Sequence, residues 1–304
     1  MKGFEVIKAG VFTLIEDIGR VSFMHLGITS SGYLDEYAAL KAHKLLDNNS
    51  SLNLLEIAFA GLKLKATADT IISITGARCE FKINGFEKNI WQTYNIKKDD
   101  ILEIKKILSG QRVYLAVKGG FNVKQELGSS SVTIKEKLGG LSGTQLKNND
   151  FLPFNEYKHY IPKRLKKEYI PSYDSILTLR VVLSYQDDSF SKKEKDKFFN
   201  SVYTITPDFN RMACKLSGEK IESCLDGIVS EGIAFGATQI PKDGQPIILL
   251  KERQTIGGYP KIGSVLSIDC FKLAQMKPGQ KIKFRQIDIT EAQAKLKKFY
   301  SSFC

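Results

Sequence analysis

A cluster of polar and charged side chains follows a short apolar run in the last third of the sequence. The run, Ile247 to Leu250, is typical of a buried strand and comes after the turn Pro241-Lys242-Asp243-Gly244. The side chains that follow are Glu252, Arg253, Gln254, Thr255, Tyr259 and Lys261. A buried strand would present these acidic, basic, amide and hydroxyl groups from a rigid scaffold, as a functional site requires. A polar hairpin turn in a β protein is the structural alternative.

The segment around this cluster, Ser230 to Gly263, is predicted to form a strand, a turn, the buried strand, the polar cluster and a glycine turn. Gly257 and Gly258 form that last turn, where we expect backbone conformations that other residues cannot adopt.

The rest of the chain predicts short strands joined by turns. Apolar runs between Leu54 and Val117 are separated by glycines and an Asn-Gly pair, which indicates an antiparallel sandwich or barrel. In the second half, a strand is also predicted at Val265–Asp269. The predicted helices are Asp35–Leu46 with Asp35 as a possible N-cap, Lys192–Phe199 after Ser191, and Thr290 to about Tyr300.

A glycine- and serine-rich passage lies between these halves. It includes Gly119-Gly120, Gly128-Ser129-Ser130-Ser131 and Gly139 to Thr144. Such backbone can form amide nests for an anion, although the order of a phosphate-binding P-loop is missing. Ordinary surface turns are the alternative.

The length of 304 residues suggests two domains, which we place at residues 1–172 and 173–304. A weak internal repeat supports this division, since Glu56 to Gly61 resembles Glu231 to Gly236. Chance similarity is the alternative. If the repeat is real, the chain forms two related β-barrel domains, with a ligand site expected in the cleft between them.

Composition excludes several classes of protein. No apolar run approaches the ~20 residues of a membrane span and no signal sequence is evident, so we expect a cytoplasmic protein. The net charge of +12 comes from 37 Lys and 8 Arg spread along the chain, which does not indicate a nucleic-acid partner. The densest basic run, Lys163 to Lys167, is typical of a solvated connector. Five cysteines without a CxxC pair and three scattered histidines predict no metal site and no disulfide framework.

Several motifs, in order along nearly the whole chain, resemble one family. They include Thr13 to Arg20, Tyr114 to Phe121, Asp243-Gly244-Gln245-Pro246-Ile247 and Gln254 to Ile262. The chain is identified by them as a member of the family of the 5-oxoprolinase C subunit, which is also called allophanate hydrolase subunit 2 or the KipA-like biotin-dependent carboxyltransferase domain.

The resemblance implies a mainly β fold of two related cyclophilin-like β-barrel domains with a few peripheral helices. It implies that the chain works with the B and A subunits of 5-oxoprolinase, which are KipI-like and LamB/YcsF-like respectively. The expected activity is hydrolysis of 5-oxo-L-proline to L-glutamate with ATP as co-substrate. Two alternatives are a non-catalytic regulator that binds a KipI-like partner, and a carboxyltransferase-type component that acts on urea or another small amide.

The resemblance also implies site residues. Arg253 and Lys261 would neutralise developing charge, and Glu231 would be either a general base or a partner for a buried amide. The substrate-binding candidates are Gln239, Gln245, Gln254, Thr255, Gly257, Gly258, Tyr259, Asp35, Glu56, Gly128 and Ser129. Asp35 fits a helix cap equally well.

Two departures from the family pattern bear on activity. Ser130 stands where the family usually has an arginine, and Glu252 stands where an aspartate usually precedes Arg-Gln-Thr. The extra methylene of Glu252 moves a carboxylate by about 1 Å, which costs ~100-fold where such a group is positioned catalytically. The loss of the arginine favours the regulator slightly.

Overall fold

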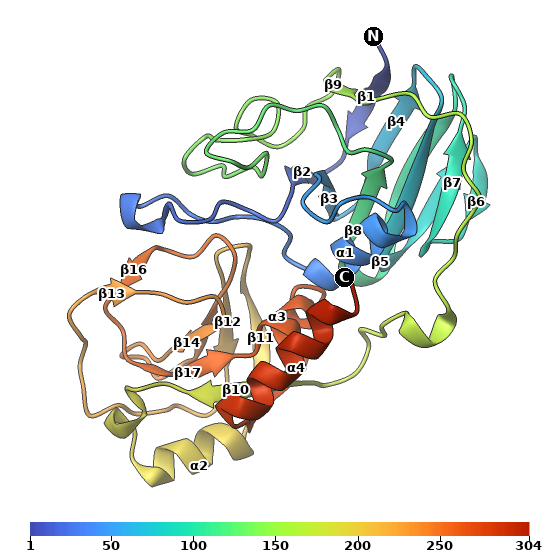
Figure 1. Cartoon of the computed structure of the whole chain (residues 1–304). Helices are drawn as coiled ribbons and strands as arrows, with labels where there is room; N and C mark the ends of the chain where they lie inside the picture. Colours follow the sequence, from blue (N-terminus) through green and yellow to red (C-terminus); the bar gives the residue numbers. More distant parts are fainter. Residues whose placement is uncertain (304) are drawn as a thin grey trace. The chain divides into compact units, whose positions relative to one another are not determined.

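The computed structural model describes residues 1 to 303, which divide into two β-rich units (Figure 1). The first unit comprises Met1–Ser22 and Ser30–Asp174, and the second comprises Phe23–Thr29 and the chain from Ser175 onward. The boundary predicted after residue 172 lies near this division. The sequence does not reveal that Phe23–Thr29, which contains the 3-10 helix η1 (Met24–Leu26), is part of the second unit.

The first unit is built on a sheet of nine strands among the described residues. The strands are β1 (Gly3–Ala9), β2 (Phe12–Glu16), β3 (Leu54–Ala58), β4 (Leu62–Ala66), β5 (Thr70–Ile83), β6 (Phe86–Lys88), β7 (Gln92–Ile96), β8 (Ile101–Val117) and β9 (Phe151–Pro153). Its main path is β2-β3-β8-β4-β1-β9, and β5 pairs with β6, β7 and β8. A core of aliphatic and aromatic side chains, including Phe4, Leu64 and Phe81, lies against this sheet.

The two longest strands each replace a pair of short predicted strands. The sequence predicts separate strands at Ile71–Thr75 and Cys79–Ile83, whereas β5 runs through both. The β5–β8 ladder continues across register shifts between Gly76 and Phe81, so the strand bends there without ending.

Helix α1 (Glu36–Leu45) begins where the sequence predicts it. Asp35 is its N-cap, and the Asp35 Oδ1 accepts a hydrogen bond of 3.1 Å from the Ala38 backbone N–H. Ala38 and Ala42 are fully buried in a second cluster with Tyr114. The prediction of Asp35 as a cap is confirmed.

The second unit contains a closed barrel (Figure 1). Its strands are β10 (Leu177–Leu183), β11 (Val202–Phe209), β12 (Ala213–Ser217), β14 (Ala237–Gln239), β15 (Ile247–Leu249), β17 (Lys261–Val265) and β18 (Lys281–Gln286). They close in the order β10-β17-β14-β15-β12-β11-β18, with β18 parallel to β10. A separate two-stranded sheet joins β13 (Glu231–Gly232) to β16 (Ile256–Gly257).

Three helices accompany the barrel in the described part of the chain. Helix α2 (Lys192–Asn200) has the predicted N-cap Ser191, and α4 (Ile289–Ser301) begins after the cap Asp288.

Helix α3 (Ser267–Leu273) occupies most of the segment predicted as a strand at Val265–Asp269, so that prediction is wrong. The strand ends at Val265, and the buried carboxylate of Asp269 instead binds the backbone N–H and the guanidinium of Arg180. This pair attaches the first turn of α3 to β10. A short apolar run is compatible with either a helix or a strand, and here a long-range contact decides between them. Two further 3-10 helices are η2 (Lys167–Tyr169) in the first unit and η3 (Asp187–Ser189) in the second.

The prediction of a mainly β fold with a few helices is confirmed. The two segments that suggested an internal repeat take different places. Glu56 lies in β3 of the large sheet, whereas Glu231 lies in β13, outside the barrel path. Among residues 1 to 303, no helix is both long and apolar enough to cross a membrane.

Candidate functional site

Lys261 and Glu231 form an ion pair in the second unit. Lys261 is the first residue of β17 and is only 6% exposed, while Glu231 comes from the short strand β13. The two residues lie in different sheets, and the Lys261 ammonium contacts the Glu231 Oε1. The structure thus brings together two of the three residues predicted to be catalytic.

Gln239 lies directly across the barrel ladder from Lys261. The register of β14 and β17 shifts between Thr238 and Gln239, and this irregularity pairs Gln239 with Lys261. Residues opposite each other on antiparallel strands present their side chains to the same face, and bulges often occur next to functional sites because they re-aim a side chain. Gln239 is 5% exposed, and no residue of the described range hydrogen-bonds its side-chain amide. That amide is a polar group at the ion pair that a ligand could satisfy.

Gly257 makes room for the Gln239 amide. A Cβ atom at residue 257 would lie 2.9 Å from the Gln239 Nε2 and 2.6 Å from the Ile233 Cδ1. Neither Gly257 nor Gly258 has a positive φ, so the expectation of a backbone that only glycine adopts is wrong. The requirement for glycine at residue 257 is one of space.

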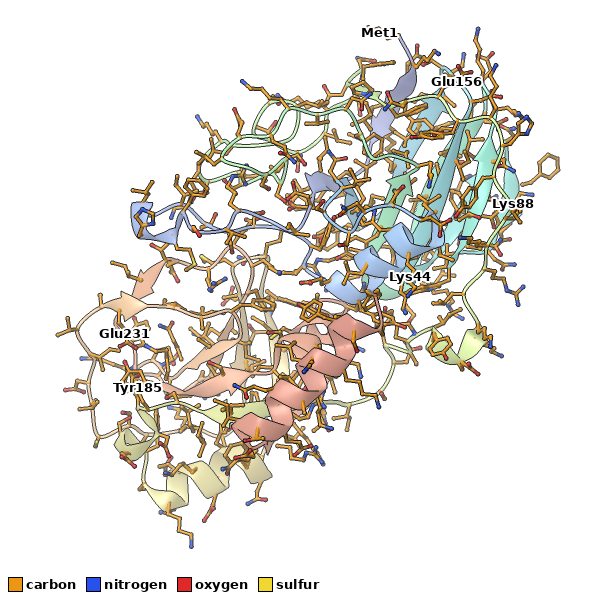
Figure 2. All side chains as sticks on the ribbon, in the orientation of Figure 1. Met1, Lys44, Lys88, Glu156, Tyr185 and Glu231 are labelled. Carbon is orange, nitrogen blue, oxygen red and sulfur yellow. The ribbon has the colours of Figure 1, made fainter. Side chains whose placement is uncertain are left out.

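Tyr185 and Gln186 complete the cluster, and the site prediction misses both. The Gln186 Nε2 donates to the Glu231 Oε1 at 2.8 Å, and its Oε1 accepts from the Lys261 backbone N–H at 2.8 Å. The Tyr185 hydroxyl donates to the Glu231 Oε2 (Figure 2 labels both residues). The one signal in the sequence is the Gln-Asp-Asp motif that starts at Gln186, which is part of the family resemblance.

These contacts fix the charge of Glu231. Hydrogen bonds from Lys261 and Tyr185 hold the pKa of the Glu231 carboxyl below its ordinary value of 4.5. The same carboxylate raises the pKa of the Tyr185 hydroxyl. At neutral pH the site therefore contains a carboxylate and a neutral phenol beside the lysine.

Arg253, the third residue predicted to be catalytic, makes its contacts elsewhere in the second unit. Its Nε donates to the Ile233 carbonyl at 2.8 Å, and its Nη1 donates to the Leu250 carbonyl at 3.2 Å. The Nη2 lies 3.5 Å from the Met24 sulfur. The side chain is 8% exposed, and burial lowers the pKa of the guanidinium to about 10, so it stays charged at neutral pH. Through these contacts the Arg253 side chain holds the segments around Ile233 and Leu250 together, which is a structural role.

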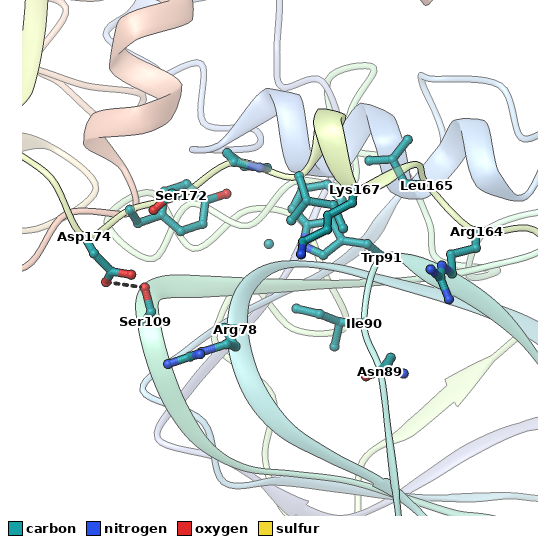
Figure 3. A pocket seen from close by; sticks show the side chains of 14 residues that line it. Arg78, Asn89, Ile90, Trp91, Ser109, Arg164, Leu165, Lys167, Ser172 and Asp174 are labelled. Carbon is teal, nitrogen blue, oxygen red and sulfur yellow. Dashed lines mark hydrogen bonds between the residues drawn. The ribbon is translucent and has the colours of Figure 1, made fainter.

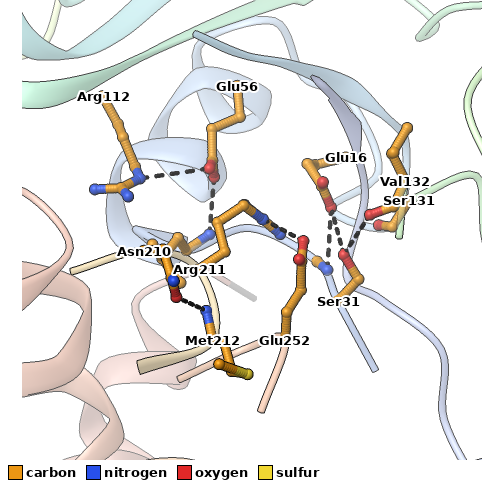
Figure 4. A network of polar contacts seen from close by, with 12 residues as sticks. Glu16, Ser31, Glu56, Arg112, Ser131, Val132, Asn210, Arg211, Met212 and Glu252 are labelled. Atoms are coloured by element: carbon orange, nitrogen blue, oxygen red, sulfur yellow. Dashed lines mark hydrogen bonds and ion pairs between the residues drawn. The ribbon is translucent and has the colours of Figure 1, made fainter. Parts of the chain in front are cut away.

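Glu252 and Gln245 also bind within the protein. The Glu252 carboxylate pairs with the Arg211 guanidinium (Figure 4). The Gln245 Oε1 accepts from the Gly218 N–H at 2.8 Å and its Nε2 donates to the Gly218 carbonyl at 3.2 Å, which attaches the turn to the end of β12.

The other predicted residues of this segment differ in exposure. Gln254 is exposed, and Thr255 is partly buried, with its carbonyl accepting from the Ile233 N–H at 3.1 Å. Tyr259 is 45% exposed. Within the described residues, none of these three side chains forms a hydrogen bond or ion pair with Lys261 or Glu231.

In the first unit, Glu56 is a buried structural anchor. Its Oε2 accepts from the Leu34 N–H at 2.9 Å and the Tyr114 hydroxyl at 2.8 Å, and its Oε1 lies 3.5 Å from the Arg112 Nε (Figure 4). The Tyr114 hydroxyl in turn accepts from the Asp35 N–H at 2.8 Å. Glu56 and Asp35 thus position the start of α1.

The turn at Gly128 and Ser129 forms an anion site that the protein itself fills. The Asp17 carboxylate accepts bonds from the Ser129 and Ser131 hydroxyls at 2.6 and 2.7 Å, and from the Ser130 N–H at 2.6 Å. All three serines are buried, in contrast to the alternative of a surface turn. The Ser130 hydroxyl also donates to Asp17, at 2.9 Å, so the residue that replaces the family arginine is part of this network.

The Gly119-Gly120 turn is likewise satisfied internally. The Gly119 N–H donates to the Asn48 Oδ1 at 3.0 Å, and the Gly120 N–H donates to the Val117 carbonyl at 3.1 Å. Among residues 1 to 303, no group of three His, Cys, Asp or Glu side chains is arranged to hold a metal ion.

Comparison with known proteins places this chain in a family. Residues 26–286 match the model of the carboxyltransferase domain, subdomain A and B. The chain is 32% identical to the C subunit of 5-oxoprolinase from Escherichia coli, over 95% of this chain and 92% of that protein. It is 31% identical to the C subunit of 5-oxoprolinase from Haemophilus influenzae, over 93% and 91%.

A larger enzyme contains the same fold. The structure of Kluyveromyces lactis urea carboxylase superposes with a TM-score of 0.93 at 25% identity, over 100% of this chain but 29% of that one. The matched region is thus less than a third of the larger protein. Together with the full-length relatives, it shows that the chain belongs to the carboxyltransferase domain family that includes the C subunit of 5-oxoprolinase.

Proposed function

We propose that this chain is the C subunit of a 5-oxoprolinase that opens 5-oxo-L-proline to L-glutamate with hydrolysis of ATP, working with the A and B subunits of that enzyme. The full-length similarity to two proteins that carry the name of this C subunit supports the assignment. The observation that carries it is the buried ammonium of Lys261, held by Glu231 beside the amide of Gln239.

Lys261 supplies positive charge where an amide reacts. Transfer of the ATP γ-phosphoryl group to the lactam oxygen spreads negative charge over the phosphoryl oxygens and the departing ADP, and the later attack of water on the ring carbon expels phosphate as an anion. A fixed ammonium in a largely buried setting stabilises that charge more strongly than water does, because the group does not reorient during the reaction. Lys261 is 6% exposed and is fixed at the start of a barrel strand.

Gln239 recognises the ring amide in this proposal. A carboxamide side chain both donates and accepts hydrogen bonds, so it can pair with the N–H and the carbonyl of a lactam. A site with such a group rejects analogues that leave it buried without a partner.

Glu231 acts here as a positioning residue. A carboxylate whose pKa lies below 4.5 is a weak base at neutral pH, so it is poorly suited to general base catalysis. Its bonds to Lys261, Tyr185 and Gln186 instead orient the ammonium.

The test is glutamate formation from 5-oxoproline and ATP by this chain mixed with the A and B subunits from the same organism. We expect Lys261→Met to lower turnover by ~100-fold or more, as removal of one oxyanion donor does. The matched control is Lys197→Met, because Lys197 also pairs with a glutamate, Glu194, at 2.7 Å in the same unit. The control variant should keep its turnover.

The outcomes are distinct. Full turnover by Lys261→Met would contradict the proposed site. A stable complex with the KipI-like partner and no turnover by the unmodified chain would contradict the enzyme assignment and favour the regulator. Urea carboxylase shares this fold at a TM-score of 0.93, so carboxyl transfer to urea is the second candidate. It is tested by replacing 5-oxoproline with urea in an assay that supplies a carboxylated biotin donor.

A further inference from the structure

A second candidate binding site lies in the first unit, between β5 and the segment that leads out of the unit. It is a pocket of about 550 Å³, within the range of small-molecule sites. Apolar and aromatic side chains form much of its wall, among them Ile90, Trp91, Leu165 and Tyr173. Figure 3 labels Ile90, Trp91 and Leu165 among the side chains that line the pocket.

Three cations line this pocket: Arg78, Arg164 and Lys167. Figure 3 shows Lys167 between the other two, with its amino group directed toward Ile90. None of these three side chains has a hydrogen-bond or ion-pair partner among residues 1 to 303. The one acidic residue in the lining is Asp174, whose Oδ1 accepts a hydrogen bond of 2.6 Å from Ser109. The pocket therefore concentrates positive charge.

The basic segment is held in place. The sequence suggests a solvated connector at Lys163 to Lys167, but its backbone pairs with β7. The Thr93 N–H donates to the Lys163 carbonyl, and the Leu165 N–H donates to the Trp91 carbonyl, both at 2.9 Å. Arg164 is bridged to Gln92 by backbone contacts. Arg164 is thus carried on fixed backbone, which lowers the entropic cost of binding a ligand.

Two local irregularities support a functional role. The register of β5 shifts on both sides of Arg78, which directs that side chain out of the regular ladder. Trp91 has a φ of 66°, a left-handed conformation that is rare for a bulky residue and is retained only where surrounding structure enforces it. Such strain occurs often at ligand sites.

We infer that this pocket binds a nucleoside di- or triphosphate. Three free cations match the two to four negative charges of such a phosphate chain, and arginine forks suit phosphate oxygens in particular. The apolar and aromatic wall would cover the base and ribose. The inference deepens the proposed function and rests on it, since it gives the ATP of that reaction a place on this chain.

The chain offers a direct readout, because Trp91 is its single tryptophan and lines the pocket. Full-length protein is titrated with ATP and with ADP while Trp91 fluorescence is excited at the long-wavelength edge of tryptophan absorption, where the nucleotides do not absorb. Isothermal titration calorimetry gives the affinity independently. We expect saturable binding of both nucleotides. Adenosine and inorganic phosphate, each with half of the contacts, should bind at least 10-fold more weakly.

Variants link binding to the pocket. Lys167→Gln and Arg164→Gln should each weaken ATP binding by about 10-fold, and Lys167→Glu by more. The matched control is Lys88→Gln, on the exposed strand β6 of the same unit and outside the pocket lining. It should leave the affinity unchanged.

Two results would overturn the inference: no fluorescence change and no heat with millimolar ATP, or binding that the Lys167 and Arg164 variants do not weaken. This assay needs neither 5-oxoproline nor the other components of the enzyme. A chain that binds ATP here but does not form glutamate would contradict the proposed function alone, and turnover without nucleotide binding here would contradict this inference alone.

Discussion

At the scale of single residues, the polar cluster after β15 separates into two kinds of group. Lys261 faces an acidic partner and an amide whose hydrogen-bonding capacity is not used within the described chain. Arg253, eight positions earlier, uses its donors on the carbonyls of Ile233 and Leu250. The first arrangement suits a ligand, and the second suits a loop anchor.

This difference predicts opposite effects of two substitutions. Arg253→Ala leaves two carbonyls without these donors in a buried region, so it should lower the free energy of unfolding by about 2–3 kcal/mol. Lys261→Met should change stability less, because the Glu231 side chain is 32% exposed and water can solvate it. Urea denaturation of both variants measures this. A stable Arg253→Ala protein with no turnover would return Arg253 to the catalytic group.

At the scale of elements, α1 contains a buried histidine. The His43 ring is 1% exposed, and its Nε2 lies 2.9 Å from the Tyr33 hydroxyl. That hydroxyl donates its proton to the Leu52 carbonyl, so the His43 Nε2 must be the donor to the hydroxyl oxygen. Through Tyr33 this contact links α1 to the segment before β3, and burial keeps the ring neutral at neutral pH because it lowers the pKa of His43.

This contact predicts a pH-dependent stability. Burial lowers the pKa of His43 from 6.5 to about 4, so between these values the unfolded chain binds a proton that the folded protein does not. Stability from this group is complete above pH 6.5 and falls as the pH decreases toward 4, by about 2 kcal/mol between pH 7.5 and pH 5.

The measurement is urea unfolding at pH 7.5 and pH 5 for the unmodified chain, His43→Leu and His159→Gln. His159 is exposed, so its substitution should leave the pH dependence intact. His43→Leu should lose about 2 kcal/mol less than the unmodified chain on acidification. An equal loss in all three proteins would show that other groups cause the pH dependence.

At the scale of the whole molecule, the second unit depends on pairing between its first and last strands. Strand β18 pairs with β10 in parallel and with β11 in antiparallel orientation, and it closes the barrel. Its Phe284 stacks on Phe198 of α2, with ring centroids 4.2 Å apart. Without β18, β10 and β11 would become open edges and part of the core would be exposed.

Truncation after Gly279 should therefore prevent the second unit from folding and leave the first unit folded. Scanning calorimetry of the full chain should show transitions from both units, because each has its own core, and the truncated chain should keep only that of the first. Truncation after Ser301, which leaves β18 and α4 in place, is the control. A native-like second transition in the chain that ends at Gly279 would contradict the importance of barrel closure.

Features that depend on neighbouring residues can be predicted from the sequence. The helices α1, α2 and α4 are predicted close to their observed bounds because side-chain periodicity and the caps Asp35 and Ser191 are local signals. The mainly β class follows from short apolar runs between turn residues. The family follows from motifs that persist in order along the chain.

Which polar residues meet depends instead on the tertiary fold. Gln186 lies 75 positions from Lys261, yet it accepts a bond from the Lys261 N–H because β10, which ends shortly before Gln186, pairs with β17 in the barrel. Similarly, Asp17 fills the serine turn from 113 positions away. Strand register decides which side chains lie on the same face of a sheet, because a shift of one residue moves every side chain to the opposite face. Register depends on long-range strand pairing, which no local sequence pattern contains.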